Sequence, residues 1–109
     1  MNHTMHPAIA AYIDAANARD AESLLRCFAS DAVVVDEEQT HRGTDEVRAW
    51  IAVTQAASQF TLEPISVSGE GAEPIVSCRV TGTFPGSPLD LRHFFTLEGD
   101  KISALSIRV

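Results

Sequence analysis

Residues 59–67 read Gln59-Phe60-Thr61-Leu62-Glu63-Pro64-Ile65-Ser66-Val67, where the helical period of the preceding chain gives way to alternation. Its apolar residues alternate with polar ones, as in a strand with one buried face. The alternation changes phase at Pro64, because Phe60 and Leu62 share one parity and Ile65 and Val67 share the other. A β-bulge would shift the phase in this way and bend the strand. The stretch therefore predicts a long bent strand and a curved sheet.

The chain that follows keeps the alternating period and is divided by Gly and Pro turns. These breaks are typical of a meander of long antiparallel strands. Strands are expected over Pro74–Phe84, Leu89–Leu97 and Ile102–Val109, with turns at 69–71, 85–88 and 99–100.

The chain before Gln59 has helical spacing instead. Pro7 suits the first turn of a helix expected to run to Ala18, because no N–H is needed there. Asp20 is expected to cap a second helix, which carries Phe28 on its apolar stripe and ends at Ser30-Asp31. Two helices should therefore form a hairpin at the N-terminal end.

A short β-hairpin and a third helix are expected next. Val33–Asp36 is β-branched, Glu37-Glu38 is typical of a turn, and Gln39–Arg42 can return as a partner strand. His41 on this outer strand is expected to be exposed. Thr44 is expected to cap the third helix, whose inner face carries Val47, Trp50, Ile51 and Thr54.

This order of elements indicates an α+β domain, since the βαβ alternation of a parallel sheet is missing. We expect three N-terminal helices packed on a curved antiparallel sheet that encloses a pocket for a small apolar molecule. The 109 residues suit one domain, residues 1–109, with one core.

Composition excludes several classes of function. The formal net charge of −7 repels phosphate backbones and anionic headgroups, so neither nucleic acid nor membrane is an expected partner. The sequence has no span-length apolar run and no signal-peptide pattern, and we expect a cytoplasmic protein. Cys27 and Cys78 are isolated, which favours buried free thiols over zinc ligands. Phosphate-loop, serine-hydrolase and zinc-protease motifs are missing, so no cofactor and no metal is expected.

Four segments resemble the nuclear transport factor 2-like superfamily, which includes ketosteroid isomerases and SnoaL-like polyketide cyclases. They are Tyr12–Asp20, Leu24–Val33, Arg42–Trp50 and His93–Ile102. The resemblance implies a cystatin-like, cone-shaped fold, a single SnoaL-like domain, and pairing of two copies through the outer sheet face. The half-apolar outer face, with Ile75 and Phe94 among polar residues, independently favours a homodimer.

The same resemblance implies roles for three residues. Tyr12 stands where ketosteroid isomerases have an oxyanion donor, and Asp36 where they have a proton-shuttling base. Their oxyanion acid precedes an aromatic pair on a late strand, and here His93 takes its place before Phe94-Phe95. This departure puts steroid chemistry in doubt.

Each of these residues has a purely structural alternative. Tyr12 can be a core tyrosine, and Asp36 can accept backbone hydrogen bonds in the turn that follows it. His93 shares the parity of the apolar face, where histidines are often hydrogen-bonded core residues. If Asp36 points into the cone, burial would raise its pKa and suit it as a base.

Two functions are therefore carried forward. The first is a cofactor-independent isomerase or cyclase for a small hydrophobic carbonyl compound, in which Asp36 removes a C–H proton while Tyr12 and His93 steady the enolate. The second is a non-catalytic small-molecule-binding or structural homodimeric module. The enzyme and the binding module would use the same pocket, which we expect to be lined by Trp50, Cys78, Val80, Phe84, Leu91 and Phe95, whereas in a structural dimer the cavity would be incidental.

Overall fold

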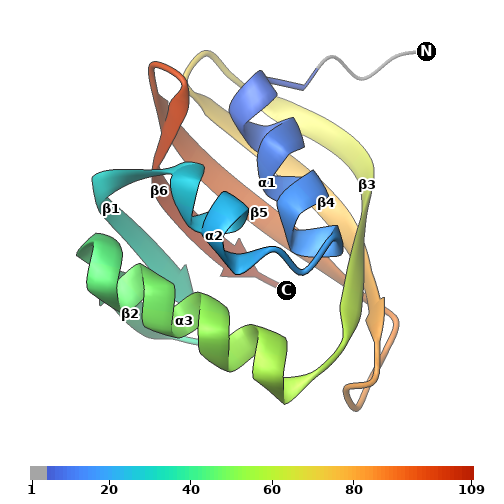
Figure 1. Ribbon diagram of the computed structural model, residues 1–109. Helices are drawn as coiled ribbons and strands as arrows, with labels where there is room; N and C mark the ends of the chain where they lie inside the picture. The colour runs from blue at the N-terminus through green and yellow to red at the C-terminus, as the bar shows by residue number, and fades with distance from the viewer. Residues whose placement is uncertain (1–4) are drawn as a thin grey trace.

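The computed structural model describes residues 5–109 and has two layers (Figure 1). Three helices cover one face of a curved six-stranded sheet, which confirms the expected α+β class. The elements are α1 (Pro7–Asn17), α2 (Ala21–Arg26), β1 (Phe28–Asp36), β2 (Gln39–Arg42), α3 (Gly43–Ala57), β3 (Phe60–Glu70), β4 (Glu73–Gly82), β5 (Leu89–Glu98) and β6 (Lys101–Arg108).

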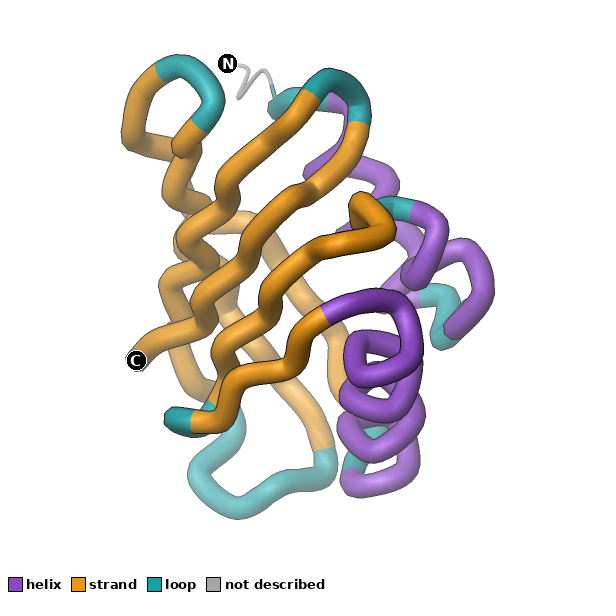
Figure 2. The backbone as a smooth tube through the Cα atoms, turned by 90° about the vertical axis from the view of Figure 1, so that its left-hand side faces the viewer, coloured by secondary structure: helices purple, strands orange, loops and turns teal. Residues whose placement is uncertain are grey.

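The strands lie in the order β2-β1-β6-β5-β4-β3, and Figure 2 shows them as one layer beside the helices. All neighbours are antiparallel except β1 and β6, which run parallel. A parallel pair needs a long connection, and α3 with strands β2 to β5 supplies it. The expected antiparallel sheet is thus confirmed apart from this pair.

The bend in β3 comes from the bulge that the sequence predicts. Pro64 pairs with Cys78 and Ser66 pairs with Ser77, so Ile65 is the extra residue on β3. Its side chain is 42% exposed, whereas Leu62 on the same strand is buried. Bulges increase twist and bend a strand, so this residue helps curve the sheet around the helices.

The second helix is shorter than predicted. Asp20 caps it as expected, with Oδ1 accepting from the Ser23 N–H at 3.1 Å. The helix ends at Arg26, however, and Phe28 is the first residue of β1. Phe28 is paired with Ile102 of β6, so strand pairing overrides a local spacing that also fits a helix.

The predicted N-cap of the third helix is also wrong. The helix begins at Gly43, and Arg42 is its N-cap residue without a side-chain cap. The Arg42 backbone N–H donates to Glu46 Oε1 at 2.7 Å, so a side chain of the first turn of the helix supplies a partner for the N-cap N–H. The Thr44 hydroxyl donates instead to the Ser30 carbonyl at 3.4 Å, which ties α3 to β1.

The turn between β1 and β2 places Asp36. Glu37 and Glu38 both have positive φ, 52° and 65°, as in the two-residue turns that suit the twist of a hairpin. Asp36 and Gln39 form the last pair before this turn. The predicted Glu37-Glu38 turn is confirmed, and it follows Asp36 directly at the C-terminal end of β1.

The core lies between the inner face of the sheet and the three helices. Its fully buried members come from helices and strands alike, for example Ile9 of α1, Ile51 of α3 and Val76 of β4. Cys27 and Cys78 are buried free thiols, as predicted. Among the described residues, no helix is long and apolar enough to cross a membrane.

Candidate functional site

Asp36, the last residue of β1, and Trp50 of α3 form a hydrogen-bonded pair. The Trp50 indole Nε1–H of α3 donates to Asp36 Oδ2 at 3.0 Å. Asp36 is half-buried on the inner face, two residues from the fully buried Val34. The pair lines a pocket of about 180 Å³ together with Glu37, Gln39, His41, Ala49, Val53 and Thr54. A carboxylate with a fixed orientation therefore faces a small opening.

Tyr12 and His93 form a second pair, deeper in the molecule. Tyr12 on α1 is 4% exposed and His93 on β5 is 2% exposed, so His93 lies on the inner face, as its parity predicts. Their ring centroids are 6.1 Å apart in an edge-to-face arrangement. The Phe28 ring contacts one member of each pair, with its centroid 6.0 Å from that of Tyr12 and 6.4 Å from that of Trp50. A row of aromatic contacts thus joins the pocket to the core.

Burial keeps both inner groups neutral. It raises the pKa of the Tyr12 hydroxyl far above its usual range, and the negative charge of Asp36 raises this pKa further. Burial also lowers the pKa of His93 to about 4, against a smaller opposite effect of the Asp36 charge. Since one carboxylate acts on both groups, the three residues lie within electrostatic reach. At neutral pH a hydroxyl and a neutral imidazole therefore stand near a carboxylate.

The His93 ring has an unused hydrogen-bonding atom. Its Nδ1 is buried and has no hydrogen-bond partner among residues 5–109. A buried polar atom left in this state costs about 1–3 kcal/mol, unless water or a ligand supplies the missing partner. His93 also has backbone hydrogen-bonding partners in Leu91 and Val76, so its role as a core residue stays an alternative to a role in binding or catalysis.

The six predicted lining residues do not surround one opening. Trp50 lines the small pocket, whereas Cys78, Val80 and Phe95 are buried and Leu91 is half-buried against the core. Phe84 was expected on a strand, but β4 ends at Gly82 and Phe84 packs half-buried from the following loop. At the end of this strand the Gly82 N–H donates to the Ser87 hydroxyl in the following loop, 2.9 Å away.

A second pocket, of about 350 Å³, opens between α2 and α3. Neither it nor the small pocket is lined by Tyr12 or His93. The structure thus brings Asp36 to Trp50 and Tyr12 to His93, and the Phe28 ring contacts Tyr12 and Trp50. The roles of these residues in binding or catalysis stay predictions.

Sequence reasoning missed two residues of this site. His41, expected to be exposed, is half-buried, lines the small pocket and lies 6.3 Å from the Trp50 ring. The hairpin register was the available signal, since His41 pairs with the buried Val34. Phe28 was missed because it was assigned to a helix. Within residues 5–109, no group of three or more His, Cys, Asp or Glu side chains could hold a metal ion.

Comparisons with known proteins agree with this fold. Residues 9–105 match the family model of the SnoaL-like domain. Among solved structures, a candidate polyketide cyclase from Sinorhizobium meliloti is 34% identical with a TM-score of 0.88, over 93% of each chain. No protein of curated function matches this chain.

Two more distant structures share the fold. A protein with a ketosteroid isomerase-like fold from Catenulispora acidiphila, bound to trimethylamine, is 18% identical with a TM-score of 0.85, over 97% of this chain and 87% of that one. A candidate polyketide cyclase from Pseudomonas putida is 20% identical with a TM-score of 0.83, over 99% and 92%.

Proposed function

The chain belongs to the SnoaL-like domain family, and from this premise we propose that it is a cofactor-independent isomerase or cyclase for a small hydrophobic carbonyl compound. One observation carries the proposal. The Asp36 carboxylate lines a pocket, is oriented by Trp50 at 3.0 Å, and acts electrostatically on two buried neutral donors, Tyr12 and His93. This is the set of groups that proton abstraction beside a carbonyl requires.

In the proposed reaction Asp36 takes a proton from the carbon beside the carbonyl. The electron pair of that C–H bond moves to the carbonyl oxygen, and the Tyr12 hydroxyl and the neutral His93 ring stabilise the resulting enolate. Returning the proton to another carbon completes an isomerisation. Attack of the enolate carbon on a second carbonyl closes a ring, and the proton held by Asp36 passes to the new alkoxide.

The proposed reaction requires a substrate to extend from the pocket at Asp36 to Tyr12 and His93, which are buried and do not line that pocket. Side chains of the core must therefore move when the substrate binds. The Nδ1 atom of His93, buried and unpartnered, would then gain a partner from the bound carbonyl oxygen.

The test is turnover of a panel of model enones and ketones by the unmodified protein and by Asp36→Asn. Removing a general base should slow turnover by about 10²- to 10⁴-fold. Glu37→Gln is the matched control, because Glu37 lines the same pocket but lies in the turn. Unchanged turnover in Asp36→Asn would remove this carboxylate from the mechanism.

A second candidate is a non-catalytic binding module. The position of Tyr12 and His93 in the core, outside both pockets, favours it. Native mass spectrometry separates the two functions. A ligand that is held and released unchanged, with no rate that depends on Asp36, supports binding.

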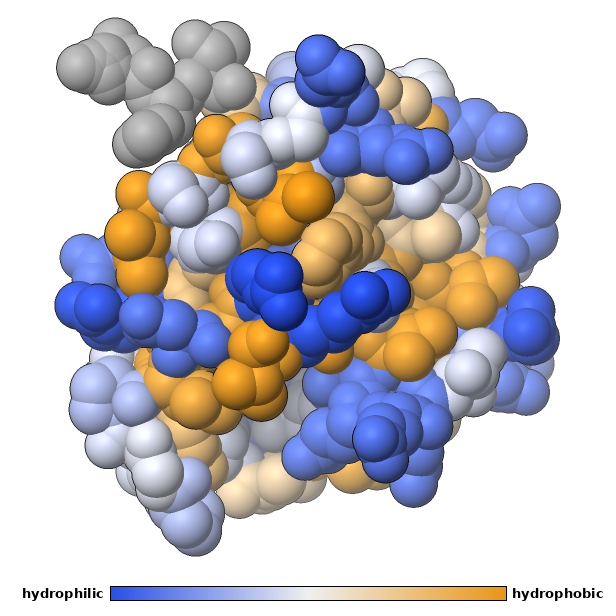
Figure 3. Space-filling model, turned by 180° about the vertical axis from the view of Figure 1, so that it is seen from behind, coloured by the Kyte–Doolittle hydropathy of each residue, from blue (hydrophilic) through white to orange (hydrophobic). Residues whose placement is uncertain are grey.

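We also infer a homodimer that forms through the outer face of the sheet, seen in Figure 3 with hydrophilic side chains among apolar ones. Ile75 and Phe94 are cross-strand partners on this face, and both are only half-buried. The guanidinium groups of Arg92 and Arg108 lie 5.4 and 4.6 Å from the centroid of the Phe94 ring. A partner subunit would cover this apolar area, which the arginines cover in part.

A further inference from the structure

The larger pocket lies away from Asp36 and has a different chemistry. It opens where α2, the beginning of β1, α3 and the first residue of β6 meet, and its volume is about 350 Å³. This is within the usual range for small-molecule sites. Its lining residues are Glu22, Leu25, Arg26, Phe28, Ala29, Ser30, Thr44, Val47, Arg48 and Lys101.

Part of this lining is apolar. Phe28 and Val47 are buried, with 7% and 1% of their surface exposed, and Leu25 and Ala29 are half-buried beside them. These side chains come from α2, β1 and α3. They offer a short apolar surface on which a hydrocarbon chain could replace water.

The remaining lining is cationic. Arg26, Arg48 and Lys101 line the pocket, and Glu22 is the only carboxylate among its lining residues. The whole chain has eight Lys and Arg residues against fifteen Asp and Glu, with a formal net charge of −7. Three of the few cations thus gather at one pocket of an acidic molecule. Charges of one sign around a concave surface attract ligands of the opposite sign.

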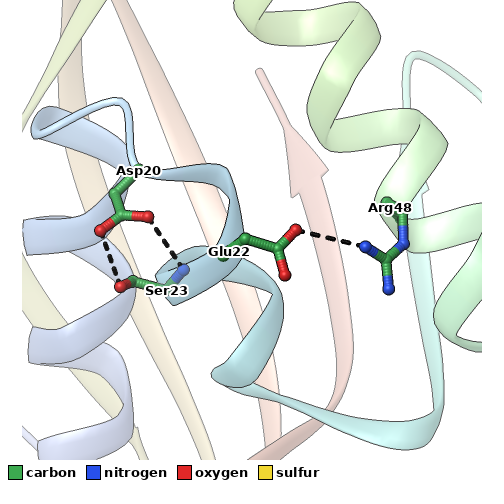
Figure 4. A network of polar contacts seen from close by, with 4 residues as sticks. All are labelled: Asp20, Glu22, Ser23 and Arg48. Atoms are coloured by element: carbon green, nitrogen blue, oxygen red, sulfur yellow. Dashed lines mark hydrogen bonds and ion pairs between the residues drawn. The ribbon is translucent and has the colours of Figure 1, made fainter.

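Fixed contacts hold these cations in place. Lys101 Nζ donates to the Arg26 carbonyl at 2.6 Å, and Arg26 Nη2 donates to the Ser23 hydroxyl at 3.2 Å. Asp20 caps α2 through the same serine, as Figure 4 shows. An arginine has five N–H donors and a lysine three, so each cation keeps donors for a ligand.

The ion pair between Glu22 and Arg48 crosses from α2 to α3 (Figure 4). The Arg48 Nη1 and Glu22 Oε2 atoms are 3.2 Å apart, and the side chains are 55% and 65% exposed. Exposed pairs of this kind contribute little stability. An anion can therefore take the place of Glu22 on Arg48 at small cost.

We propose that this pocket binds a small amphiphilic anion, a carboxylate attached to a short hydrocarbon chain. The carboxylate lies against Arg48, Arg26 and Lys101, and the hydrocarbon chain lies on Leu25, Ala29 and the exposed part of Phe28. Neither the carboxylate of Asp36 nor the rings of Tyr12 and His93 line this pocket, so its ligand would be held by groups other than those assigned to the proposed reaction.

Calorimetric titration with octanoate tests the proposal, with acetate and 1-octanol as probes of the headgroup and the chain alone. Octanoate should bind more tightly than either. Arg48→Gln should weaken octanoate binding about tenfold, the usual value of one charge-assisted hydrogen bond. Glu22→Gln should strengthen it, because the competing carboxylate is gone.

Arg79→Gln is the matched control. Arg79 also forms an exposed ion pair, with Asp90 at 3.1 Å, but it lies on the outer face of the sheet. Both substitutions remove one positive charge, so a general electrostatic effect would be equal in the two variants. The proposal is overturned if octanoate shows no binding at millimolar concentration, if octanol binds as tightly, or if Arg79→Gln weakens binding as much as Arg48→Gln.

Discussion

Burial of His93 should make the stability of the fold depend on pH. The pKa of His93 is about 4 in the folded protein, against 6.5 for an exposed histidine. As the pH falls below 6.5, the unfolded chain takes up a proton at this residue before the folded protein does. Protonation therefore favours the unfolded chain, and stability is lost between pH 6.5 and 4.

The two pKa values set the size of the effect. Over the whole interval, the free energy of unfolding should fall by about 3 kcal/mol through His93 alone. At pH 5 the unfolded histidine is mostly protonated and the folded one mostly is not, so about 2 kcal/mol of this loss should be present. Such a loss is a large share of the stability of a small domain.

Urea unfolding at pH 7 and pH 5, followed by circular dichroism, measures this loss. His93→Phe removes the titrating group, so between the two pH values this variant should lose about 2 kcal/mol less than the unmodified protein. His41→Gln is the control, since His41 lies at the pocket and not in the core. An equal pH dependence in His93→Phe and the unmodified protein would refute the reasoning.

Direct titration of His93 in the unmodified protein tests the same prediction without relying on the folding of the His93→Phe variant. The ring protons of His93 in the unmodified protein, followed by NMR, should show no protonation above about pH 5. A midpoint near 6.5 would mean that the imidazole is hydrated in the folded protein.

Three further outcomes follow from the structure. Phe94→Glu should convert the dimer to a monomer in light scattering, and an unmodified protein that is already monomeric at micromolar concentration would contradict this interface. Burial raises the pKa of the Cys78 thiol to about 11. This thiol should therefore resist iodoacetamide at pH 8 until urea unfolds the chain. Rapid labelling of Cys78 in the folded protein would contradict its burial. Glu38→Gly should raise the free energy of unfolding by about 0.5–1 kcal/mol, because glycine accepts the φ of 65° without strain. The melting temperature should rise accordingly. A lower melting temperature would show that Glu38 makes a compensating contact.

Local signals were sufficient for much of the fold. The phase change at Pro64 predicted the bulge of β3, and the acidic pair Glu37-Glu38 predicted the turn after β1. Pro7 and Asp20 marked where the first two helices begin. In each case the cause lies within a few residues of its effect, so the sequence alone contains it.

Features set by distant pairing could not be found in this way. Phe28 fits the spacing of α2, but its backbone is paired with β6, more than seventy residues further along. Thr44 is a good capping residue by type, yet its hydroxyl bonds to Ser30 of β1. The parallel direction of β1 and β6 likewise depends on how the whole chain closes the sheet.

The candidate site likewise combines features that nearby residues determine with features that only distant contacts determine. Residue types and parity selected Tyr12, Asp36 and His93 and placed His93 on the inner face. No periodic pattern could show that Trp50 donates to Asp36, because this contact depends on the packing of α3 against β1.

Deuterium incorporation into a model ketone in D₂O tests the central claim most directly, because it reports removal of a C–H proton without requiring a complete turnover. We expect the unmodified protein to exchange the hydrogen beside the carbonyl, and Asp36→Asn to exchange it about 10²- to 10⁴-fold more slowly. Glu37→Gln should exchange at the unmodified rate. Equal exchange by Asp36→Asn and the unmodified protein would contradict the account.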